Sequence, residues 1–269
     1  LESIREYDIP VVAGGPFCTY GSERVAGCPD VDFIIRGEGE APLRELSLAI
    51  INDTSHKEIA NLVYRDGDNL IQNDMRPAME LNDIPFADYD VFIKNDKDTL
   101  YRPMCGSIYK TISLETQRGC PFKCSFCNSA SNNPLYKEET GSVFFRKKEM
   151  SRLAEELDYM ISTINPELVY FVSDVFLLMT DREFDEFYEV YSSYKIPFFM
   201  QTRAETITEY RVRKLEELNC LRANVGLEHG NEQFRRDVVK RKLKDVEITQ
   251  AFNIIGSSSI STAANNIIG

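Results

Sequence analysis

The sequence has no long apolar run and no excess of basic residues. None of its hydrophobic stretches reaches the roughly 20 residues that an α-helix needs to cross a bilayer. No basic, apolar, small-residue signal opens the chain. The net charge is -12, whereas a protein that binds the phosphate backbone of nucleic acids needs a basic face. We therefore expect no membrane span and no nucleic-acid partner.

Histidine is scarce, and the cysteines do not suit a disulfide framework. The only histidines are His56, expected in a solvated turn, and His229, expected to be structural. Seven cysteines make an odd count without regular spacing, which argues against a secreted disulfide-rich fold. Three of them lie within eight residues, which indicates a metal site. Cys18, Cys28 and Cys220 are expected to be ordinary buried thiols.

The length of 269 residues, 43% of them hydrophobic, allows one large domain or two. The chain begins without methionine and stops directly after an apolar stretch. We therefore expect it to be an internal fragment of a longer protein. With no secretion signal, the expected localisation is cytoplasmic.

Residues 1–80 have the pattern of a small α/β domain. Strands are expected over 10–13 and 31–35, a helix over 43–51, and a hairpin around Asp66-Gly67. Each of the first two strands ends in glycines, where exposed backbone N–H groups suit an anion or a nucleotide tail. The candidate binding residues of this region are Gly14, Gly15, Gly37 and Gly39.

Residues 81–108 are expected to form a linker, because their extended, proline-punctuated stretches lack periodicity. From residue 109 to 269 strands alternate with helices, which predicts a parallel sheet. Five strand–helix units favour an incomplete, partial (β/α)6 TIM-like barrel. The strands are expected over 110–114, 168–172, 198–201, 222–228 and 262–268. The helices are expected near 150–164, 184–194 and 210–218, with further helical segments between 234 and 252.

Cys120, Cys124 and Cys127 form a C-x-x-x-C-x-x-C motif after the first of these strands. Three thiolates in one short loop suit a [4Fe–4S] cluster, because each iron accepts a cysteine. Three ligands for four irons leave one iron open. A structural zinc site would need a fourth ligand, for which Cys105 and His229 are candidates. A ferredoxin-type electron carrier would need a fourth cysteine nearby.

This motif, including Phe126 just before the last cysteine, resembles the signature of the radical S-adenosylmethionine superfamily. The resemblance covers roughly residues 109–269 and implies a partial (β/α)6 barrel. It also implies that the open iron chelates S-adenosylmethionine and that one electron cleaves the sulfonium to a 5′-deoxyadenosyl radical. A flavodoxin- or ferredoxin-type electron donor and an oxygen-poor or reducing cytoplasm would follow. The substrate, a small molecule or a peptide, is not identified.

Polar residues end the later strands, and chemistry in such barrels lies at the carboxyl ends of strands. By the resemblance, these positions hold the methionine part and the ribose of the cofactor. Arg203 is expected to meet the cofactor carboxylate, because a guanidinium fork suits it. Glu228 is expected to accept hydrogen bonds from ribose hydroxyls, and Asp174 to meet the amino group. Gln201 belongs to the same candidate set. The alternative for each is a helix cap or a surface pair.

The glycine-ended strands of residues 1–92, with Asp83-Ile84-Pro85-Phe86 in the linker, resemble the later part of a cobalamin-binding domain. Such a domain precedes the barrel in one large subgroup of the superfamily. The subgroup's Asp-x-His-x-x-Gly motif, which supplies the lower cobalt ligand, is absent from this chain. The alternative is a plain Rossmann-like half-domain.

Three functions remain open from the sequence. The first is a cobalamin-dependent radical enzyme, for example a C-methyltransferase. The second is a radical enzyme without methyl transfer that performs cyclisation, rearrangement or oxidation. The third is a non-enzymatic iron–sulfur or zinc protein with a structural or redox-sensing role.

Overall fold

The computed structural model describes residues 6–95 and 97–268. It divides the chain into two compact units. The first unit comprises Leu1–Glu80 together with Pro134–Phe144, and the second comprises Leu81–Asn133 together with Phe145–Gly269. Among the described residues, no helix is both long enough and apolar enough to cross a membrane.

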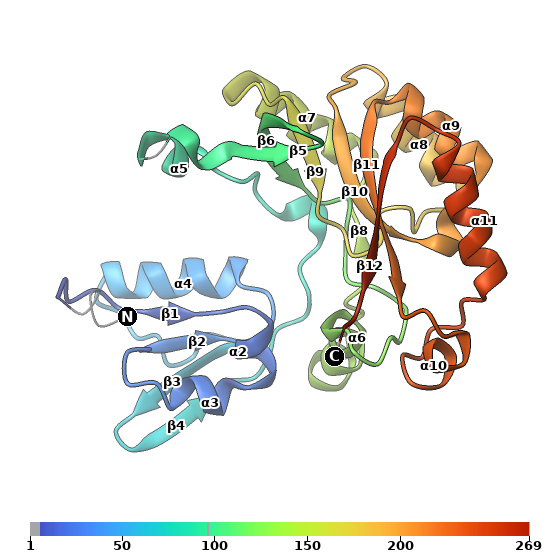
Figure 1. The fold of residues 1–269 in the computed structure, drawn as a ribbon. Coiled ribbons are helices and arrows are strands. Elements are labelled where there is room, and N and C mark those ends of the chain that lie inside the picture. The colour runs from blue at the N-terminus through green and yellow to red at the C-terminus, as the bar shows by residue number, and fades with distance from the viewer. Residues whose placement is uncertain (1–5, 96, 269) are drawn as a thin grey trace. The chain divides into compact units, whose positions relative to one another are not determined.

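The first unit is a four-stranded sheet in the order β1-β2-β3-β4 with short helices (Figure 1). β1 and β2 are parallel, whereas β3 pairs antiparallel with both β2 and β4. The predicted hairpin is present, with Gly67 at a φ of +63° in its turn. The strands are β1 (Val12–Ala13), β2 (Phe33–Ile35), β3 (Leu62–Asp66) and β4 (Asn69–Gln72). The helices are α2 (Pro16–Tyr20), α3 (Ser22–Ala26) and α4 (Glu40–Ile51).

Helix α4 was expected from its apolar periodicity, but α2 and α3 were not. Each of those two helices has five residues, which is too short for a helical period to show in the sequence. Buried Leu46 of α4 packs with Leu62 of β3 in the core of this unit. Contacts of this kind hold the strand ends that carry the turn glycines.

The second half of α6 (Asn128–Thr140) belongs to the first unit. Its Tyr136 is 1% exposed, and its hydroxyl accepts a hydrogen bond from the Glu38 N–H at 2.8 Å. The ring of Tyr136 also packs on Phe144, with centroids 4.7 Å apart. This segment therefore completes the core of a unit that it follows by more than fifty residues in sequence.

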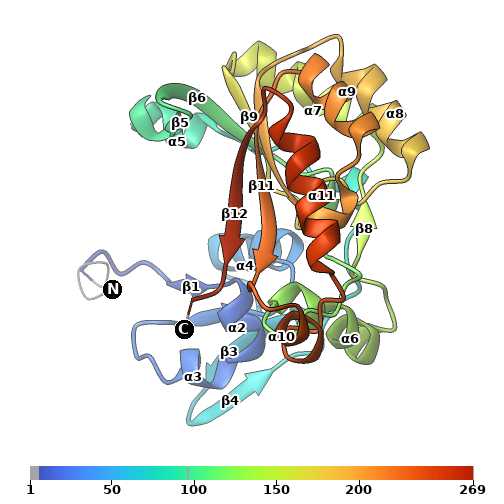
Figure 2. The same cartoon turned by 45° about the vertical axis from the view of Figure 1, so that its right-hand side comes forward.

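The second unit is built on a six-stranded sheet in the order β12-β11-β10-β9-β6-β5 (Figure 2). β6, β9, β10, β11 and β12 are parallel to one another, and only β5 is antiparallel. This mixed α/β architecture with a curled half-barrel sheet confirms the predicted fold class. The strands are β5 (Tyr101–Met104), β6 (Ser107–Leu114), β9 (Leu168–Phe171), β10 (Phe198–Arg203), β11 (Cys220–Glu228) and β12 (Ser261–Asn266).

Helices α7, α8, α9 and α11 lie between successive parallel strands and cover one face of the sheet, whereas the short α10 lies beyond the end of β11 (Figure 1). They begin where the sequence supplies caps: Thr180 and Glu183 form a capping box on α8, and Thr208 caps α9. The helices are α7 (Met150–Thr163), α8 (Asp181–Tyr191), α9 (Glu209–Glu217), α10 (Glu232–Asp237) and α11 (Asp245–Gly256).

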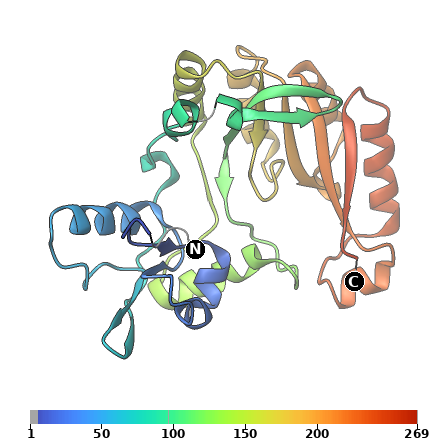
Figure 3. The same cartoon turned by 60° about the vertical axis from the view of Figure 1, so that its left-hand side comes forward.

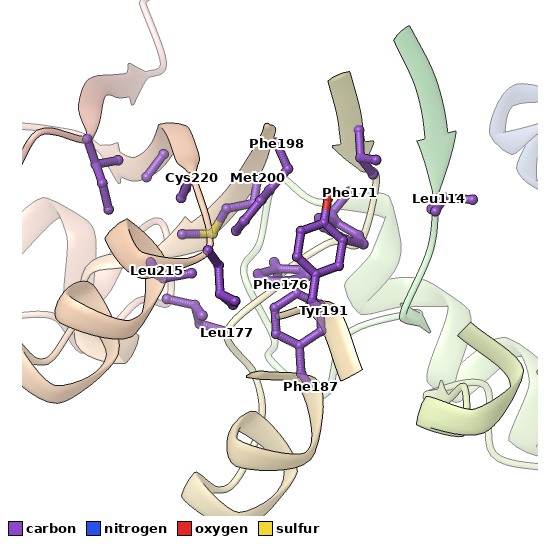
Figure 4. Packing of buried hydrophobic residues seen from close by; sticks show 14 of the residues in the cluster. Leu114, Phe171, Phe176, Leu177, Phe187, Tyr191, Phe198, Met200, Leu215 and Cys220 are labelled. Atoms are coloured by element: carbon purple, nitrogen blue, oxygen red, sulfur yellow. The ribbon is translucent and has the colours of Figure 1, made fainter. Parts of the chain in front are cut away.

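The core between sheet and helices is rich in aromatic rings (Figure 4). The ring of Phe171 on β9 makes edge-to-face contacts with three other rings, at centroid distances of 5.4 to 5.6 Å. These rings belong to Phe187 and Tyr191 of α8 and to Phe198 of β10. Tyr191 and Phe198 also contact each other edge to face, with centroids 5.2 Å apart. Because Phe198 and Met200 of β10 are fully buried, the intervening Phe199 and Gln201 point to the opposite face of the sheet. That opposite face carries the site described below.

Residues 81–108 contain more regular structure than the sequence indicated. They form η1 (Leu81–Asp83), α5 (Asp90–Asn95), η2 (Lys97–Leu100) and β5. β5 pairs with β6 as a hairpin (Figure 3). Its turn is Cys105-Gly106, both with positive φ, and Pro103 is tolerated because β5 lies at the sheet edge. The proline obscured the strand in the sequence.

Candidate functional site

The cysteine loop follows β6 and a two-residue strand, β7 (Gln117–Arg118), which pairs antiparallel with β8 (Arg146–Lys147). Side chains and backbone hold the loop from both ends. The Asn133 side-chain amide donates to the Cys120 carbonyl at 2.7 Å, and the Ser125 N–H donates to the Val239 carbonyl at 3.0 Å. The loop is therefore fixed by α6 on one side and by the segment after α10 on the other.

Cys120, Cys124 and Cys127 are free thiols that line one pocket of about 150 Å³. Cys120 and Cys124 are buried, and Cys127 is half-buried. Burial raises the pKa of the Cys120 thiol. Three thiols that open to one pocket are the donor set that a cluster with one open iron requires. The donor chemistry of the pocket therefore fits a [4Fe–4S] cluster.

The same pocket gathers the other residues that the sequence singled out from strand ends. Asp174 follows β9, Gln201 and Arg203 lie on β10, Glu228 ends β11, and Phe126 comes from the cysteine loop. They meet because the carboxyl ends of parallel strands lie at one edge of a sheet. Further lining residues are Val175, Thr202, Asn224, Gly226, Arg241 and Asn265.

Arg203 is engaged with the protein rather than free in the pocket. Its Nε donates to the Glu205 carboxylate at 2.7 Å, and its Nη1 donates to the Cys124 Sγ at 3.3 Å. Its guanidinium also stacks on Phe122, 3.7 Å from the ring centroid. Arg203 thus places a positive charge and an N–H donor directly on a candidate cluster ligand.

Arg241 joins the pocket residue Glu228 to Glu205 and was missed from the sequence. It is 3% exposed. Its Nη1 donates to Glu228 at 2.7 Å and its Nη2 to Glu205 at 3.3 Å, while its Nε has no hydrogen-bond partner in the described part of the chain. Arg241 lies within the basic stretch from Lys240 to Lys244, which is typical of a solvated surface, so no local signal marked it.

Burial and the two arginines together shift the pKa values of Glu228 and Glu205 in opposite directions. Burial raises the pKa of Glu228, an effect that Arg241 and Arg203 partly oppose. Burial also acts to raise the pKa of Glu205, but Arg203 and Arg241 outweigh it and lower that pKa. Burial lowers the pKa of Arg241. Of these two carboxyls, Glu228 is therefore the one that more readily accepts a proton.

A glycine makes room for this arrangement. A Cβ on Gly226 would collide with the Glu228 carboxylate and would lie 2.8 Å from Arg241 Nη1. Glu228 itself has a φ of +70°, a strained backbone conformation for a residue with a side chain. The end of β11 is thus shaped to turn the Glu228 carboxylate toward Arg241.

The remaining pocket candidates also have defined partners. The Ser129 hydroxyl of α6 donates to Asp174 at 2.9 Å. The Gln201 side-chain amide donates to the Tyr170 hydroxyl. Phe126 is 50% exposed, so its ring is accessible at the pocket.

The turn glycines of the first unit lie at one edge of its sheet, because β1 and β2 are parallel. Gly15 caps α2 with a φ of +95°, and no atom lies within 4 Å of a Cβ placed on Gly14, Gly15 or Gly39. Gly37 differs: its N–H donates to the Thr19 hydroxyl at 3.0 Å. Gly14, Gly15 and Gly39 leave open space for a ligand, whereas Gly37 serves a close approach to Tyr136.

The ligands considered for a zinc site do not join the pocket. Neither Cys105 nor His229 lines it. His229 Nδ1 accepts the Asn231 N–H at 3.0 Å, and its ring packs on Phe234. Over residues 6–95 and 97–268, no three His, Cys, Asp or Glu side chains converge to hold a single metal ion. Thiolates that bind three different irons of a cluster need no such convergence.

The sequence profile of the Radical SAM superfamily matches residues 114–269, more than half of the chain. An uncharacterized methyltransferase of Pyrococcus horikoshii is 28% identical over 228 residues, which cover 82% of this chain and 46% of the relative. The anaerobic magnesium-protoporphyrin IX monomethyl ester cyclase of Cereibacter sphaeroides is 25% identical over 269 residues, which cover 96% of this chain and 41% of the cyclase. The chain thus spans less than half the length of these relatives.

Solved structures of radical S-adenosylmethionine enzymes resemble the fold. The cobalamin-dependent S-adenosylmethionine radical enzyme OxsB, with aqua-cobalamin and S-adenosylmethionine bound, matches with a TM-score of 0.71 and 18% identity, covering 99% of this chain and 37% of OxsB. The radical S-adenosylmethionine methyltransferase TsrM from Kitasatospora setae, with cobalamin and a [4Fe–4S] cluster bound, matches with a TM-score of 0.69 and 14% identity, covering 97% of this chain and 50% of TsrM. At these identities the likeness concerns the fold.

Proposed function

Because this chain belongs to the Radical SAM superfamily, we propose that it binds a [4Fe–4S] cluster through Cys120, Cys124 and Cys127 and cleaves S-adenosylmethionine reductively. The observation that carries the proposal is the convergence of these three thiols with polar strand-end residues on one pocket. When bound, the cluster supplies one electron, which splits the sulfonium into methionine and a 5′-deoxyadenosyl radical. A flavodoxin- or ferredoxin-type protein of a reducing cytoplasm is the proposed electron donor.

The chain's own residues then hold and orient S-adenosylmethionine. Asp174, positioned by Ser129, accepts hydrogen bonds from the amino group. Glu228, turned by Arg241, accepts hydrogen bonds from the ribose hydroxyls. Arg203 remains the candidate for the carboxylate through the guanidinium N–H groups that it does not direct at Glu205 or Cys124. Phe126 and Gln201 complete the wall of the pocket.

For the complete protein we propose cobalamin-dependent methyl transfer to a carbon atom. The support is the fold shared with OxsB and TsrM and the methyltransferase relative. In the first unit, Gly14, Gly15 and Gly39 provide open backbone at the ends of two parallel strands, which suits the nucleotide tail of such a cofactor. The second candidate is a cyclase or oxidoreductase without methyl transfer, which the similarity to the anaerobic cyclase over 96% of the chain favours.

Anaerobic reconstitution with iron and sulfide tests the radical chemistry. We expect about four irons per chain and, after reduction with S-adenosylmethionine present, formation of 5′-deoxyadenosine. Cys124→Ala should abolish both. Cys28→Ala is the matched control, because Cys28 is a free thiol of the first unit outside the pocket, and it should behave like the wild type. Iron loading that survives Cys124→Ala, or a cluster that never cleaves S-adenosylmethionine, would contradict the proposal.

Product analysis separates the two candidate reactions. Methyl transfer consumes a second S-adenosylmethionine and yields S-adenosylhomocysteine that depends on added cobalamin. A cyclase or oxidoreductase yields 5′-deoxyadenosine without cobalamin-dependent S-adenosylhomocysteine. The measurement is chromatography of both nucleosides with and without hydroxocobalamin, on the full-length protein.

A further inference from the structure

A second pocket lies on the same sheet as the cysteine pocket, and it has a volume of about 460 Å³. We propose that this second pocket binds the substrate, and that the substrate is an apolar ring compound with one anionic group. The inference rests on the proposed function, since it takes the cysteine pocket as the source of the radical. The pocket is lined by residues of the 81–108 segment and by three strands, including Tyr89, Leu100, Arg102, Met104, Tyr170 and Phe199.

The two pockets are neighbours along β10. Phe199 lines the second pocket, whereas Gln201 and Arg203 line the cysteine pocket. Alternate residues of a strand point to the same face of the sheet, so these three side chains form one row along β10. Gln201 also donates a hydrogen bond to Tyr170, which lines the second pocket. A molecule that contacts Phe199 or Tyr170 in the second pocket is therefore next to Gln201, which lines the cysteine pocket.

Two aromatic rings, those of Tyr170 and Phe199, line the second pocket. The rings of Tyr170 and Phe199 stack with centroids 4.1 Å apart and planes within 3° of each other. Leu100, Pro103 and Met104 add apolar surface. A pocket of this size with mainly apolar and aromatic walls is typical of small-molecule sites. Flat rings favour an occupant that itself contains a ring system, because offset stacking adds to the burial of apolar area.

Among the described residues that line this pocket, Arg102 of β5 is the one with a cationic side chain. Arg102 is exposed and makes no ion pair with another residue of the part of the chain that the structure describes. Tyr89 fixes the opposite wall, since its hydroxyl accepts the Ser113 N–H of β6 at 2.9 Å. A guanidinium beside an apolar wall selects a carboxylate, sulfonate or phosphate group on the occupant. Ring stacking and one anion contact together define the proposed substrate class.

Two fluorescent probes with the same rings test this assignment. 1-Anilinonaphthalene-8-sulfonate carries one anionic group, and N-phenyl-1-naphthylamine is its uncharged counterpart. We expect the folded chain to bind both. Phe199→Ala should weaken both by about tenfold, because half of the stacked wall is lost. Arg102→Gln should weaken the sulfonate by about tenfold and leave the uncharged probe within about twofold.

The controls locate the binding site and separate this inference from the radical chemistry. Ile51→Ser alters an exposed apolar residue of the first unit and should leave both affinities unchanged. Cys124→Ala should abolish 5′-deoxyadenosine yet retain probe binding, so failure of one idea is distinguishable from failure of the other. Far-UV circular dichroism checks each variant, and Phe199→Leu replaces Phe199→Ala if the latter does not fold. Wild-type affinity for the probes in both Phe199 variants would overturn the proposal that this pocket is the binding site. Equal weakening of the two probes by Arg102→Gln would overturn the proposal that the substrate carries an anionic group.

Discussion

At the residue scale, Arg203 makes contacts within the protein that its expected role did not include. It was expected to meet a cofactor carboxylate, yet it donates to the Cys124 Sγ and to Glu205 and stacks on Phe122. Hydrogen bonds to the cysteine sulfurs of a cluster help to set its reduction potential. Under the proposed function, Arg203 would therefore link the binding of the cofactor to the ease of reduction.

Replacing Arg203 should lower the reduction potential of the reconstituted cluster. Arg203→Gln removes a positive charge and an N–H donor beside Cys124, which disfavours the added electron. We expect a fall of about 60 mV, equivalent to roughly tenfold in a one-electron equilibrium. A redox titration followed by electron paramagnetic resonance measures it. Arg182→Gln, at a side chain that is 86% exposed, is the control, and an unchanged potential in Arg203→Gln would exclude this role.

Glu205 should stabilise the fold in a pH-dependent way. Its pKa is lowered in the folded state because Arg203 and Arg241 outweigh burial. Its contribution is therefore present above the ordinary glutamate pKa of about 4.3 and is lost as the pH falls through the lowered folded value. Its side chain is 29% exposed, so we expect Glu205→Gln to cost about 2 kcal/mol at pH 7.

Urea unfolding of wild type and Glu205→Gln at a series of pH values measures this contribution. The difference in unfolding free energy should shrink toward zero as the pH falls below about 4. Glu209→Gln, the same change at an exposed position of α9, should give a small difference at every pH. A difference for Glu205→Gln that grows on acidification would contradict a lowered pKa for this carboxyl in the folded state.

At the element scale, the end of β11 shows how a strand is adapted to a site. Nine residues run from Cys220 to Glu228, and the last of them depart from regular strand geometry. The register with β12 shifts between Gly226 and Glu228. This irregularity aims Glu228 at Arg241 instead of along the pleat.

Gly226→Ala should disturb binding at the pocket more than it disturbs the fold. The added Cβ would displace the Glu228 carboxylate and Arg241. We expect the affinity for S-adenosylmethionine to fall about tenfold, with a stability change of about 1 kcal/mol. Equilibrium binding to the reconstituted protein and thermal unfolding measure the two effects. Gly256→Ala, where a Cβ meets no atom within 4 Å, is the matched control, and undiminished affinity in Gly226→Ala would refute this geometry.

At the scale of the whole molecule, the first unit includes a segment that is remote in sequence. Pro134–Phe144 lies within the chain that follows the cysteine loop, yet it clusters with Leu1–Glu80. Tyr136 of this segment accepts a hydrogen bond from the Glu38 N–H, and its ring packs on the ring of Phe144. The first unit is thus completed only after the cysteine loop has been synthesised.

Tyr136→Ala should therefore loosen the first unit selectively. Loss of a fully buried aromatic side chain costs about 3 to 5 kcal/mol, and the Glu38 N–H loses its acceptor. We expect faster hydrogen exchange at residues 33–40 and unchanged protection of β9 and β10. Tyr136→Phe keeps the ring and should raise exchange mainly at Glu38. If Tyr136→Ala lowered protection from hydrogen exchange equally in both units, the two units would not open independently of each other, and the prediction would be wrong.

The sequence by itself determined what depends on neighbours in the chain. Three cysteines in eight residues define a candidate cluster loop, and the alternation of apolar strands with helices predicted the α/β half-barrel, which the structure confirms. Both signals are local, since a motif spans one loop and a strand or helix shows its own period. The parallel order also predicted that Asp174, Arg203 and Glu228 would share one edge.

Only the tertiary structure decided which of these groups touch. Arg241 reaches Glu205 across 36 positions, and Phe122 meets Arg203 across more than 80. The second pocket joins the 81–108 segment to β9 and β10. Such contacts depend on how helices and strands pack and on strand register. Residues that are far apart in the sequence can therefore touch, and the sequence pattern around each of them does not show it. The sequence therefore indicated the chemistry of the cysteine loop, and the fold assigned its charged neighbours and the cavity beside it.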